Sequence, residues 1–244
     1  MAIMLLTPTS KSLILPMFQK FQAHLLKSFP HLKNQKTLLA LSGGVDSCVL
    51  LSLCLKNGLN ISIAHCNFQL RGKDSEEDAL WIKKKAEAKK LECHIKKFDT
   101  LIYAENKKIS VQMAARKLRY DWFNELSVKY KYDVILIAHH ADDVLETFMI
   151  NVMRGTGLKG LVGIPEIRGK IIRPLLPFTR MEILNYANEY TIEWREDTSN
   201  AKTDYLRNKL RHKVIPHWKA TDSNFHNRFS NTLEYLGQAK IALD

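Results

Sequence analysis

The stretch TLLALSGGVDSCVLLSLCLKNG, residues 37–58, decides the fold. Its first six residues (37–42) form a short apolar run that ends in a Gly-Gly turn, which is typical of a buried parallel strand. From Asp46 the apolar spacing becomes helical, and it stops at Gly58, a residue suited to follow the end of a helix. The stretch therefore predicts a strand, a glycine turn and a helix in direct succession.

The same alternation of strand and helix continues towards the C-terminus. Strand-like runs lie at 61–67, 93–98 and 133–139, and helical patterns lie at 74–90, 110–130 and 142–153. The run 93–98 alternates as an edge strand does, whereas 133–139 is the most hydrophobic run and is expected near the sheet centre. The pattern predicts an α/β fold with a doubly wound, mainly parallel sheet and helices on both faces.

Both ends of the chain are expected to add helices. Near the N-terminus we predict a helix that covers a core with Leu13, Phe18, Phe21 and Leu25. After the alternating region we predict, in order, a short strand near 171–173, a helix at 179–190, a polar loop at 191–203, a basic helix at 204–215 ended by Pro216, and a tail helix at 222–243.

Composition narrows the class of protein. The 244 residues carry a formal net charge of +12, which indicates a polyanionic partner such as nucleic acid, and a hydrophobic content of 45% excludes wholesale disorder. The apolar N-terminus is too interrupted by Thr, Ser, Lys and Pro to span a bilayer, so no membrane partner is expected. Cys48, Cys54, Cys66 and Cys93 form no C-x-x-C pair, so we expect buried free thiols in a reducing cytoplasm.

The turn SGGVDS (42–47) predicts a phosphate site. Glycines allow backbone N–H groups to turn inward, and the following helix N-terminus adds about half a positive charge. The loop lacks the G-K-[ST] ending of a Walker A motif. A carboxylate at Asp46 would repel phosphates unless a cation lay between them, which implies Mg²⁺. The alternative is a simple turn in which Asp46 or Ser47 caps the helix, but the strand–loop–helix context favours a nucleotide.

A second chemical motif, AHHADDVLET (138–147), follows the run 133–139. Ligands bind at the carboxyl ends of strands in sheets of this kind. Asp143 and Glu146 are three residues apart and share one helix face, where two carboxylates can hold an ammonium ion and help an amine lose a proton. Two alternatives are that Asp142 and Asp143 only cap the helix, or that the His/Asp cluster binds a hydrolytic metal. The neighbouring phosphate loop weakens both.

These motifs together resemble a known family. SGGVDS resembles the phosphate loop of the PP-loop ATP pyrophosphatases, which cleave ATP to AMP and pyrophosphate. The wider set of strings is similar to that of the tRNA(Ile)-lysidine synthetases and covers most of 37–216. The strings are SGGVDS (42–47), HCNFQLRG (65–72), AARKLRY (114–120), AHHADDVLET (138–147), RGTGLKGLVGI (154–164), RPLL (173–176) and EDTSNAKTDYLRNKLR (196–211).

The resemblance implies an activity and assigns roles. ATP would adenylate the C2 carbonyl oxygen of the wobble cytidine of tRNA(Ile) with the anticodon CAU, and the side-chain amine of free L-lysine would then displace AMP. Asp143 and Glu146 would bind lysine, and Arg116 would act on the phosphate or adenylate; with Asp46 these complete the expected catalytic set. ATP and Mg²⁺ would be bound by Ser42, Gly43, Gly44, Val45, Asp46 and Ser47.

Other matched positions are less specific. His65 lies where the adenine or ribose would bind, but it can equally be a buried histidine at a strand end. Phe68 stands where the family often has a histidine, so no role of that histidine is carried over. Basic residues of the strings and of the segment 204–219 are expected to contact tRNA phosphates. They are Arg71, Arg154, Lys159, Arg207, Lys209 and Arg211.

Two rival functions remain. Another PP-loop tRNA modifier, such as a thiolase, usually needs a persulfide cysteine or an iron–sulfur cluster, and the scattered cysteines argue against it. A tRNA-binding protein without catalysis would be expected to have lost Asp46, Asp143 or Glu146. We expect a catalytic ATP-binding domain at 1–217, and a helix or linker at 218–244 leading to a tRNA-binding domain absent from this chain. The sequence leaves the oligomeric state open, with a homodimer among the alternatives.

Overall fold

The computed structural model describes residues 16–196, 206–222 and 224–243. Six strands form one sheet in the order β3-β2-β1-β4-β6-β5. All neighbours are parallel except β5 and β6, which are antiparallel. The strands are β1 (Thr37–Ala40), β2 (Ile61–Asn67), β3 (Cys93–Lys97), β4 (Val134–Leu136), β5 (Ile167–Arg168) and β6 (Ile171–Ile172). The predicted doubly wound α/β fold is confirmed, with β3 at an edge and β4 inside the sheet.

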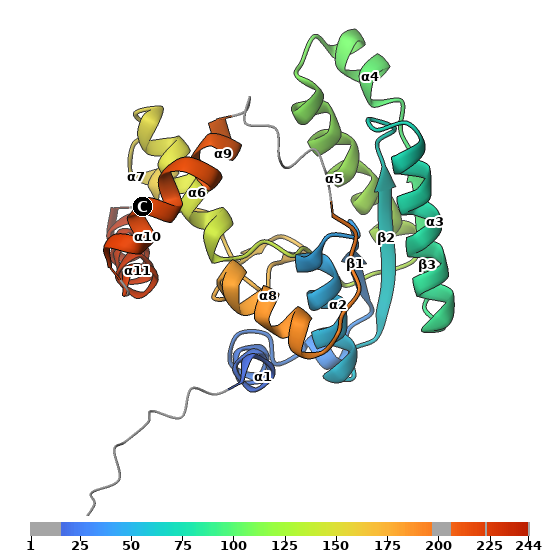
Figure 1. Cartoon of the computed structure of the whole chain (residues 1–244), viewed down its shortest axis with the longest axis horizontal. Helices are drawn as coiled ribbons and strands as arrows, with labels where there is room; N and C mark the ends of the chain where they lie inside the picture. The colour runs from blue at the N-terminus through green and yellow to red at the C-terminus, as the bar shows by residue number, and fades with distance from the viewer. Residues whose placement is uncertain (1–15, 197–205, 223, 244) are drawn as a thin grey trace, which may run out of the picture.

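Helices surround this sheet and extend to one side of it (Figure 1). The α-helices before the middle of the chain are α1 (Met17–Ser28), α2 (Val45–Lys56), α3 (Lys73–Ala88), α4 (Thr100–Lys107) and α5 (Val111–Lys129). Those that follow are α6 (Ala141–Met153), α7 (Leu158–Leu161), α8 (Arg180–Glu189), α9 (Leu206–Lys209), α10 (Ile215–Thr221) and α11 (Phe225–Leu243). None of these helices, in the part of the chain that the structure describes, is both long and apolar enough to cross a membrane.

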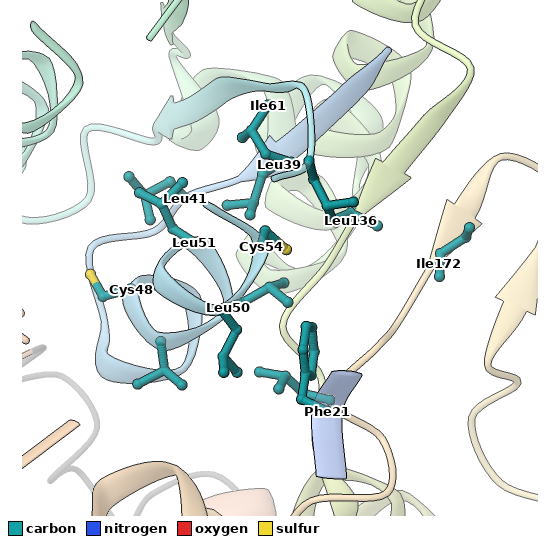
Figure 2. Close-up of a cluster of buried hydrophobic side chains, with 14 of the residues drawn as sticks. Phe21, Leu39, Leu41, Cys48, Leu50, Leu51, Cys54, Ile61, Leu136 and Ile172 are labelled. Atoms are coloured by element: carbon teal, nitrogen blue, oxygen red, sulfur yellow. The ribbon is translucent and has the colours of Figure 1, made fainter. Parts of the chain in front are cut away.

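The period of two along β1 divides the core into two layers. Leu39 packs with α1, α2 and α8 on one face, a cluster that includes Phe21 and Leu50 (Figure 2). Leu38 points to the opposite face and packs against Trp122 and Phe123 of α5. Successive side chains of a strand alternate between faces, so one four-residue strand is buried on both sides. The predicted core positions Phe21 and Leu25 are buried, whereas Leu13 lies outside the described residues.

The strand order brings the two chemical motifs together. β1 pairs with β2 on one side and with β4 on the other, with Thr37 in register with both Ile61 and Val134. The strands that follow β1 along the chain are therefore added first on one side of β1, as β2 and β3, and later on its other side, as β4. Such a reversal of strand order opens a crevice at the carboxyl ends of the two strands. The loop 42–47 follows β1 and the segment 138–147 follows β4, so both lie at this crevice.

Several sequence predictions need correction. Pro216 does not end the basic helix: a π-helical turn, Leu210–Val214, runs directly into α10, and Pro216 lies in the first turn of α10. Proline is tolerated there because the amides of a first turn have no intrahelical partner. α4 and β5 were not predicted, and Cys66 and Cys93 are only partly buried, although all four cysteines are free thiols.

Candidate functional site

The glycine loop closes on itself. The Ser47 hydroxyl donates to the Gly44 carbonyl oxygen at 2.9 Å and accepts from the Ser42 backbone N–H at 3.2 Å. Gly43 has a φ of +94°, a conformation that L side chains rarely adopt, so glycine is required at this turn. The N-cap of α2 is Gly44, which has no side chain with which to cap. The loop therefore presents the uncapped N-terminus of α2, the arrangement that favours an anion.

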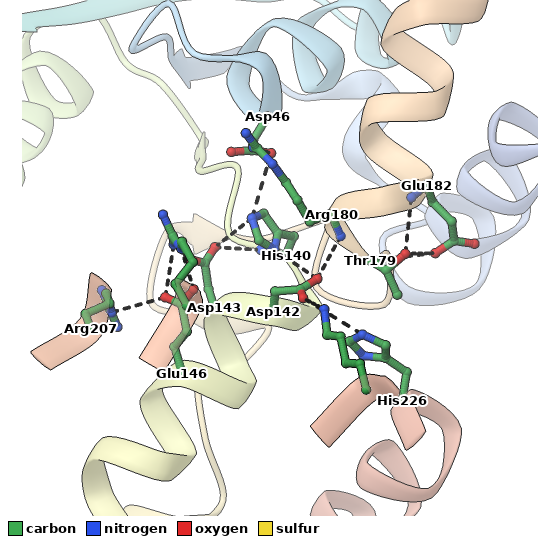
Figure 3. Close-up of polar contacts among 12 residues, drawn as sticks. Asp46, His140, Asp142, Asp143, Glu146, Thr179, Arg180, Glu182, Arg207 and His226 are labelled. Carbon is green, nitrogen blue, oxygen red and sulfur yellow. Dashed lines mark hydrogen bonds and ion pairs between the residues drawn. The ribbon is translucent and has the colours of Figure 1, made fainter. Parts of the chain in front are cut away.

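Asp46 lies in the first turn of α2 and faces the crevice. Its carboxylate is ion-paired with Arg180, the first residue of α8 (Figure 3). It therefore does not act as the helix cap considered from the sequence. Behind the loop, the Arg195 backbone N–H donates to the Gly43 carbonyl oxygen at 2.9 Å, and the Arg195 side chain pairs with Asp78 of α3. The loop is thus held from α3, while its carboxylate reaches across to α8.

Two histidines precede α6. His139 Nδ1 accepts a hydrogen bond from Arg173 Nε at 3.0 Å, which requires the neutral ring. Burial lowers the pKa of His139 to about 4; Asp143 opposes the shift and Arg173 adds to it. His140 is buried between carboxylates, with its Nε2 atom 3.7 Å from Asp46 Oδ1 and 3.6 Å from Asp143 Oδ2. His140 therefore links the glycine loop to α6.

The start of α6 carries three carboxylates, and cations from the C-terminal helices lie against them (Figure 3). Asp142 pairs with Lys219 of α10 and also accepts a hydrogen bond from the Arg180 backbone N–H at 2.7 Å. Arg211 binds Glu146 with two nitrogens, Nε at 2.6 Å and Nη2 at 3.0 Å. The predicted pair Asp143 and Glu146 therefore does share one face, and that face binds a cation.

Two further contacts between guanidinium groups and this face are longer. Arg211 Nη2 lies 3.4 Å from Asp143 Oδ1, and Arg207 Nε lies 3.4 Å from Glu146 Oε2. The second Asp143 oxygen accepts from the His140 backbone N–H at 3.0 Å. This bond caps α6, so the alternative that Asp143 caps the helix is confirmed. The other oxygen of the same side chain contacts the Arg211 guanidinium, so Asp143 has a second contact besides the cap.

The two carboxylates differ in their electrostatics. Burial raises the pKa of Glu146, although the hydrogen bonds from Arg211 oppose the shift. Burial alone would also raise the pKa of Asp143, but the neighbouring His140 and His139 rings, the His140 backbone N–H and Arg211 together hold it below its usual value. The face thus offers one carboxylate stabilised as an anion beside one that accepts a proton more readily.

The other predicted residues of the site lie around this crevice. His65 donates from Nδ1, in one tautomer, to the Leu41 carbonyl oxygen at 2.9 Å and is buried; burial lowers its pKa. Arg71 pairs with Asp78 at 2.5 Å. Arg116 is exposed on α5, with its guanidinium 5.0 Å from the Tyr120 ring centroid. The structure thus gives His65 a structural bond and leaves Arg116 accessible.

Arg116 lines a pocket of about 590 Å³ between α5 and the β5–β6 hairpin. Arg173 lines the same pocket and also contacts His139, so the pocket adjoins the crevice. By contrast, Arg154, Lys159 and Lys209 are exposed and are not part of the network around α6. The glycine-rich loop that carries Lys159 forms the short helix α7, which contacts α6 and α11.

Sequence reasoning missed several cations of the site. Arg180 was not identified, and Arg207, Arg211 and Lys219 were grouped in a basic segment expected to contact tRNA phosphates, with no contact to α6 foreseen. Arg173 belonged to a matched string, RPLL, but no role was assigned to it. A local signal existed only for Arg180, which directly follows Thr179, the N-cap of α8 in a capping box with Glu182. The capping box fixes where α8 begins, and therefore fixes the direction in which its first residue, Arg180, leaves the helix.

The oxygen donors at the crevice suit a metal ion that arrives with a nucleotide. Asp46 offers a hard carboxylate oxygen beside an anion site, and Mg²⁺ is commonly bound by one or two carboxylates together with substrate phosphates. The residues therefore fit a Mg²⁺ ion that arrives with a nucleotide. Among the described residues, no group of three or more His, Cys, Asp and Glu side chains could hold a metal by itself. The alternative of a hydrolytic His/Asp metal centre has no support there.

Comparison with known proteins agrees with this geometry. A family model described as a PP-loop domain matches residues 17–218. The tRNA(Ile)-lysidine synthase of Bacteroides thetaiotaomicron is 38% identical over 218 residues, 89% of this chain and 51% of that protein. The protein of the same name from Porphyromonas gingivalis strain W83 is 42% identical over 204 residues, 83% of this chain and 45% of that protein. This chain thus spans about half the length of these curated relatives.

Solved structures share the fold at low sequence identity. A U34-tRNA thiolase from Methanococcus maripaludis, with its [4Fe-4S] cluster, has a TM-score of 0.73 at 20% identity, covering 89% of this chain and 78% of that one. An NMN synthetase from Francisella tularensis has a TM-score of 0.51 at 16% identity, covering 90% and 93%. At these identities the likeness concerns the fold alone.

Proposed function

This chain belongs to the PP-loop family, and on that premise we propose that it carries the catalytic domain of a tRNA(Ile)-lysidine synthase. The reaction joins free L-lysine to C2 of the wobble cytidine in a CAU anticodon and converts ATP to AMP and pyrophosphate. The curated relatives of that name, at 38–42% identity over more than four-fifths of the chain, support the assignment.

The observation that carries the proposal is the cation bound on α6. Asp143 and Glu146 hold a guanidinium at the crevice that Asp46 and the glycine loop also face. A pair of carboxylates that accepts a cation at this position can accept the ammonium group of a lysine side chain. The amine has an ordinary pKa near 10.4 and must lose a proton before it attacks. Glu146, with its raised pKa, is the better placed of the two to receive that proton.

The proposed chemistry has two steps. The cytidine C2 carbonyl oxygen attacks the α-phosphorus of ATP, and the bond to pyrophosphate breaks. The lysine Nε lone pair then attacks C2, the C2–O bond breaks, and AMP leaves. The loop 42–47 and the N-terminus of α2 would hold the phosphates, and Asp46 would hold Mg²⁺, which supplies charge neutralisation when bound. Arg116 would stabilise charge on the α-phosphate.

The partners follow from the same proposal. Exposed cations at Arg154, Lys159 and Lys209 would contact the tRNA backbone, with affinity that falls as salt rises. We place the reaction in the cytoplasm, where its tRNA and free thiols are expected. The division into a catalytic domain at 1–217 and a linker at 218–244, and a homodimeric assembly, stay predictions that light scattering and limited proteolysis can test.

A thiolase function has less support. Its chemistry usually requires a reactive cysteine or a cluster, but Cys48 and Cys54 lie on α2 while Cys66 and Cys93 lie on separate strands. Burial raises the pKa of Cys48 to about 11 and that of Cys66 to about 12, which disfavours the thiolate. A binding protein without catalysis has no need of the intact set Asp46, Asp143 and Glu146.

The test is direct transfer of lysine. The protein is incubated with Mg-ATP, labelled lysine and unmodified tRNA(Ile) bearing a CAU anticodon, and label in the tRNA is measured together with AMP. We expect label in the tRNA in a one-to-one ratio with AMP. The absence of label while the tRNA still binds would refute the proposal.

A further inference from the structure

The proposed lysine site, Asp143 and Glu146, is occupied by the protein's own Arg211. All four oxygens of Asp143 and Glu146 already have a partner: Arg211 contacts three of them, and the His140 backbone N–H donates to the fourth. A lysine ammonium offers three donors and no acceptor, so it would need the same oxygens. Arg211 and the substrate amine therefore compete for one pair of carboxylates.

The position of Arg211 allows its side chain to move away from the two carboxylates. The Glu146 side chain is 1% exposed, whereas the Arg211 side chain is 35% exposed, so the guanidinium covers the carboxylate from the solvent side. Arg211 comes from a π-helical turn (Leu210–Val214), a rare conformation that is often found at functional sites. Movement of the Arg211 guanidinium would expose the carboxylates without disturbing α6, because the apolar cluster of Leu145, Met149, Leu210 and Ile215 holds both segments together and does not include Arg211.

Arg211 is also linked to the phosphate site. Asp46, His140, Asp143 and Arg211 form a chain of contacts with successive separations of 3.7, 3.6 and 3.4 Å. Burial would lower the pKa of Arg211, but Glu146, Asp143 and also Asp46 raise it, so the guanidinium lies within the field of the glycine loop. A phosphate near that loop would attract Arg211, since guanidinium groups bind phosphate in a bidentate manner.

We propose that Arg211 is an internal competitor of lysine, which occupies Asp143 and Glu146 until a phosphate-bearing ligand draws it away. The inference rests on the proposed function, because it assumes that this pair is the lysine site. The ligand is the triphosphate of ATP or the backbone of tRNA, which share the same chemistry. Lysine affinity then depends on a bound phosphate, and by linkage lysine tightens the phosphate ligand by the same factor.

The experiment measures lysine binding by equilibrium dialysis with labelled lysine. Wild-type protein is compared alone, with Mg²⁺ and α,β-methylene ATP, and with tRNA(Ile). We expect one of the two ligands to lower the Kd for lysine at least about tenfold, as for a competent state populated at roughly one part in ten without it. The arm that does so identifies the source of the phosphate.

Variants separate this device from a structural role. Arg211→Gln should bind lysine tightly without any phosphate and respond less than about twofold to either ligand. Arg211→Lys, which keeps a cation but loses the bidentate geometry, should lie between the two. Lys213→Gln, an exposed residue of the same π-helical turn, carries the same charge change and should behave as wild type in the arms without tRNA. Circular dichroism and Tm verify folding.

The outcomes are decisive for both proposals. Equal responses to phosphate in wild type and Arg211→Gln, or tight lysine binding by wild type alone, would overturn the competitor. If label still enters tRNA in that case, the proposed function stands. If Arg211→Gln gains lysine affinity but wild type never transfers lysine, the competitor stands and the reaction must be reassigned.

Discussion

The glycine loop and the acidic face of α6 are held by different kinds of contact. The Ser47 hydroxyl closes the loop through hydrogen bonds between residues five or fewer apart, and longer-range polar contacts from the described part of the chain reach only the Gly43 carbonyl oxygen and the Asp46 carboxylate. The carboxylates of α6 instead take their side-chain cations from far along the chain, with Lys219 lying 77 residues from Asp142. A local turn keeps its shape whether or not a ligand is bound. Long-range ion pairs can exchange partners, so we expect the acidic face to be the region whose state depends on ligands.

The largest expected effect comes from a substitution in the glycine loop that leaves the carboxylates of α6 in place. Asp46→Asn removes the carboxylate proposed to hold Mg²⁺, and we expect lysine transfer to fall about 1,000-fold. Lysine affinity, measured by dialysis without nucleotide or tRNA, should change less than threefold. Asp74→Asn is the matched control, because Asp74 also lies in the first turn of a helix, α3, and is exposed. An active Asp46→Asn protein would remove Asp46 from the phosphate site.

The reciprocal substitution removes a charge from the acidic face of α6 and leaves the glycine loop unchanged. Glu146→Gln keeps the side-chain shape but removes the charge that faces the amine, so kcat/KM for lysine should fall about 100-fold. The affinity for α,β-methylene ATP, measured without lysine, should stay within about threefold of wild type. Glu125→Gln, an exposed glutamate on α5, is the control. A loss of nucleotide affinity equal to the loss of lysine affinity would mean that the two regions are one site.

The fold was predictable where one face of each element is apolar. The bounds predicted for β2, 61–67, agree with those observed, because the whole strand is apolar or buried. α4 escaped prediction because its large apolar residues Leu101 and Ile102 are exposed and mark no buried face. The two residues of β5 are exposed as well. Hydrophobic periodicity indicates which face of an element is buried, and neither α4 nor β5 shows such a periodicity.

The carboxylates of the site could be found from the sequence, but their partners could not. Asp143 and Glu146 are three residues apart on one helix, and that spacing alone places them on one face. Arg211 is one of 37 Lys and Arg residues, and nothing local distinguishes it from the exposed Lys213 beside it. Only the packing of Leu210 and Ile215 against α6 brings Arg211 to Glu146.

A pH effect on stability tests the burial of His139 beside Arg173, next to the acidic face. The pKa of His139 is lowered from its model-peptide value near 6.5 to about 4 in the folded protein, so its contribution to stability is present above pH 6.5 and is lost as the pH falls towards 4. His139→Asn keeps an acceptor for Arg173 but cannot titrate. We expect wild type to lose about 2–3 kcal/mol more than this variant between pH 7 and pH 4, measured by urea unfolding.

The control for that pH effect is the exposed His31. His31→Asn should follow wild type at every pH, because an exposed side chain has nearly the same surroundings before and after unfolding. Parallel curves for wild type and His139→Asn would show that the ring is not held neutral by burial beside Arg173.

The smallest expected effect concerns the self-closure of the loop. Ser47→Ala removes the hydroxyl that joins Gly44 to Ser42, and the lost hydrogen bonds should lower the free energy of unfolding by about 1 kcal/mol. Ser52→Ala, on the same helix, should change it by less than about 0.5 kcal/mol. The affinity for α,β-methylene ATP should fall only a few-fold, since the backbone amides remain. If it fell 100-fold instead, the loop would depend on a single side chain to hold its shape, and its contrast with the acidic face would be lost.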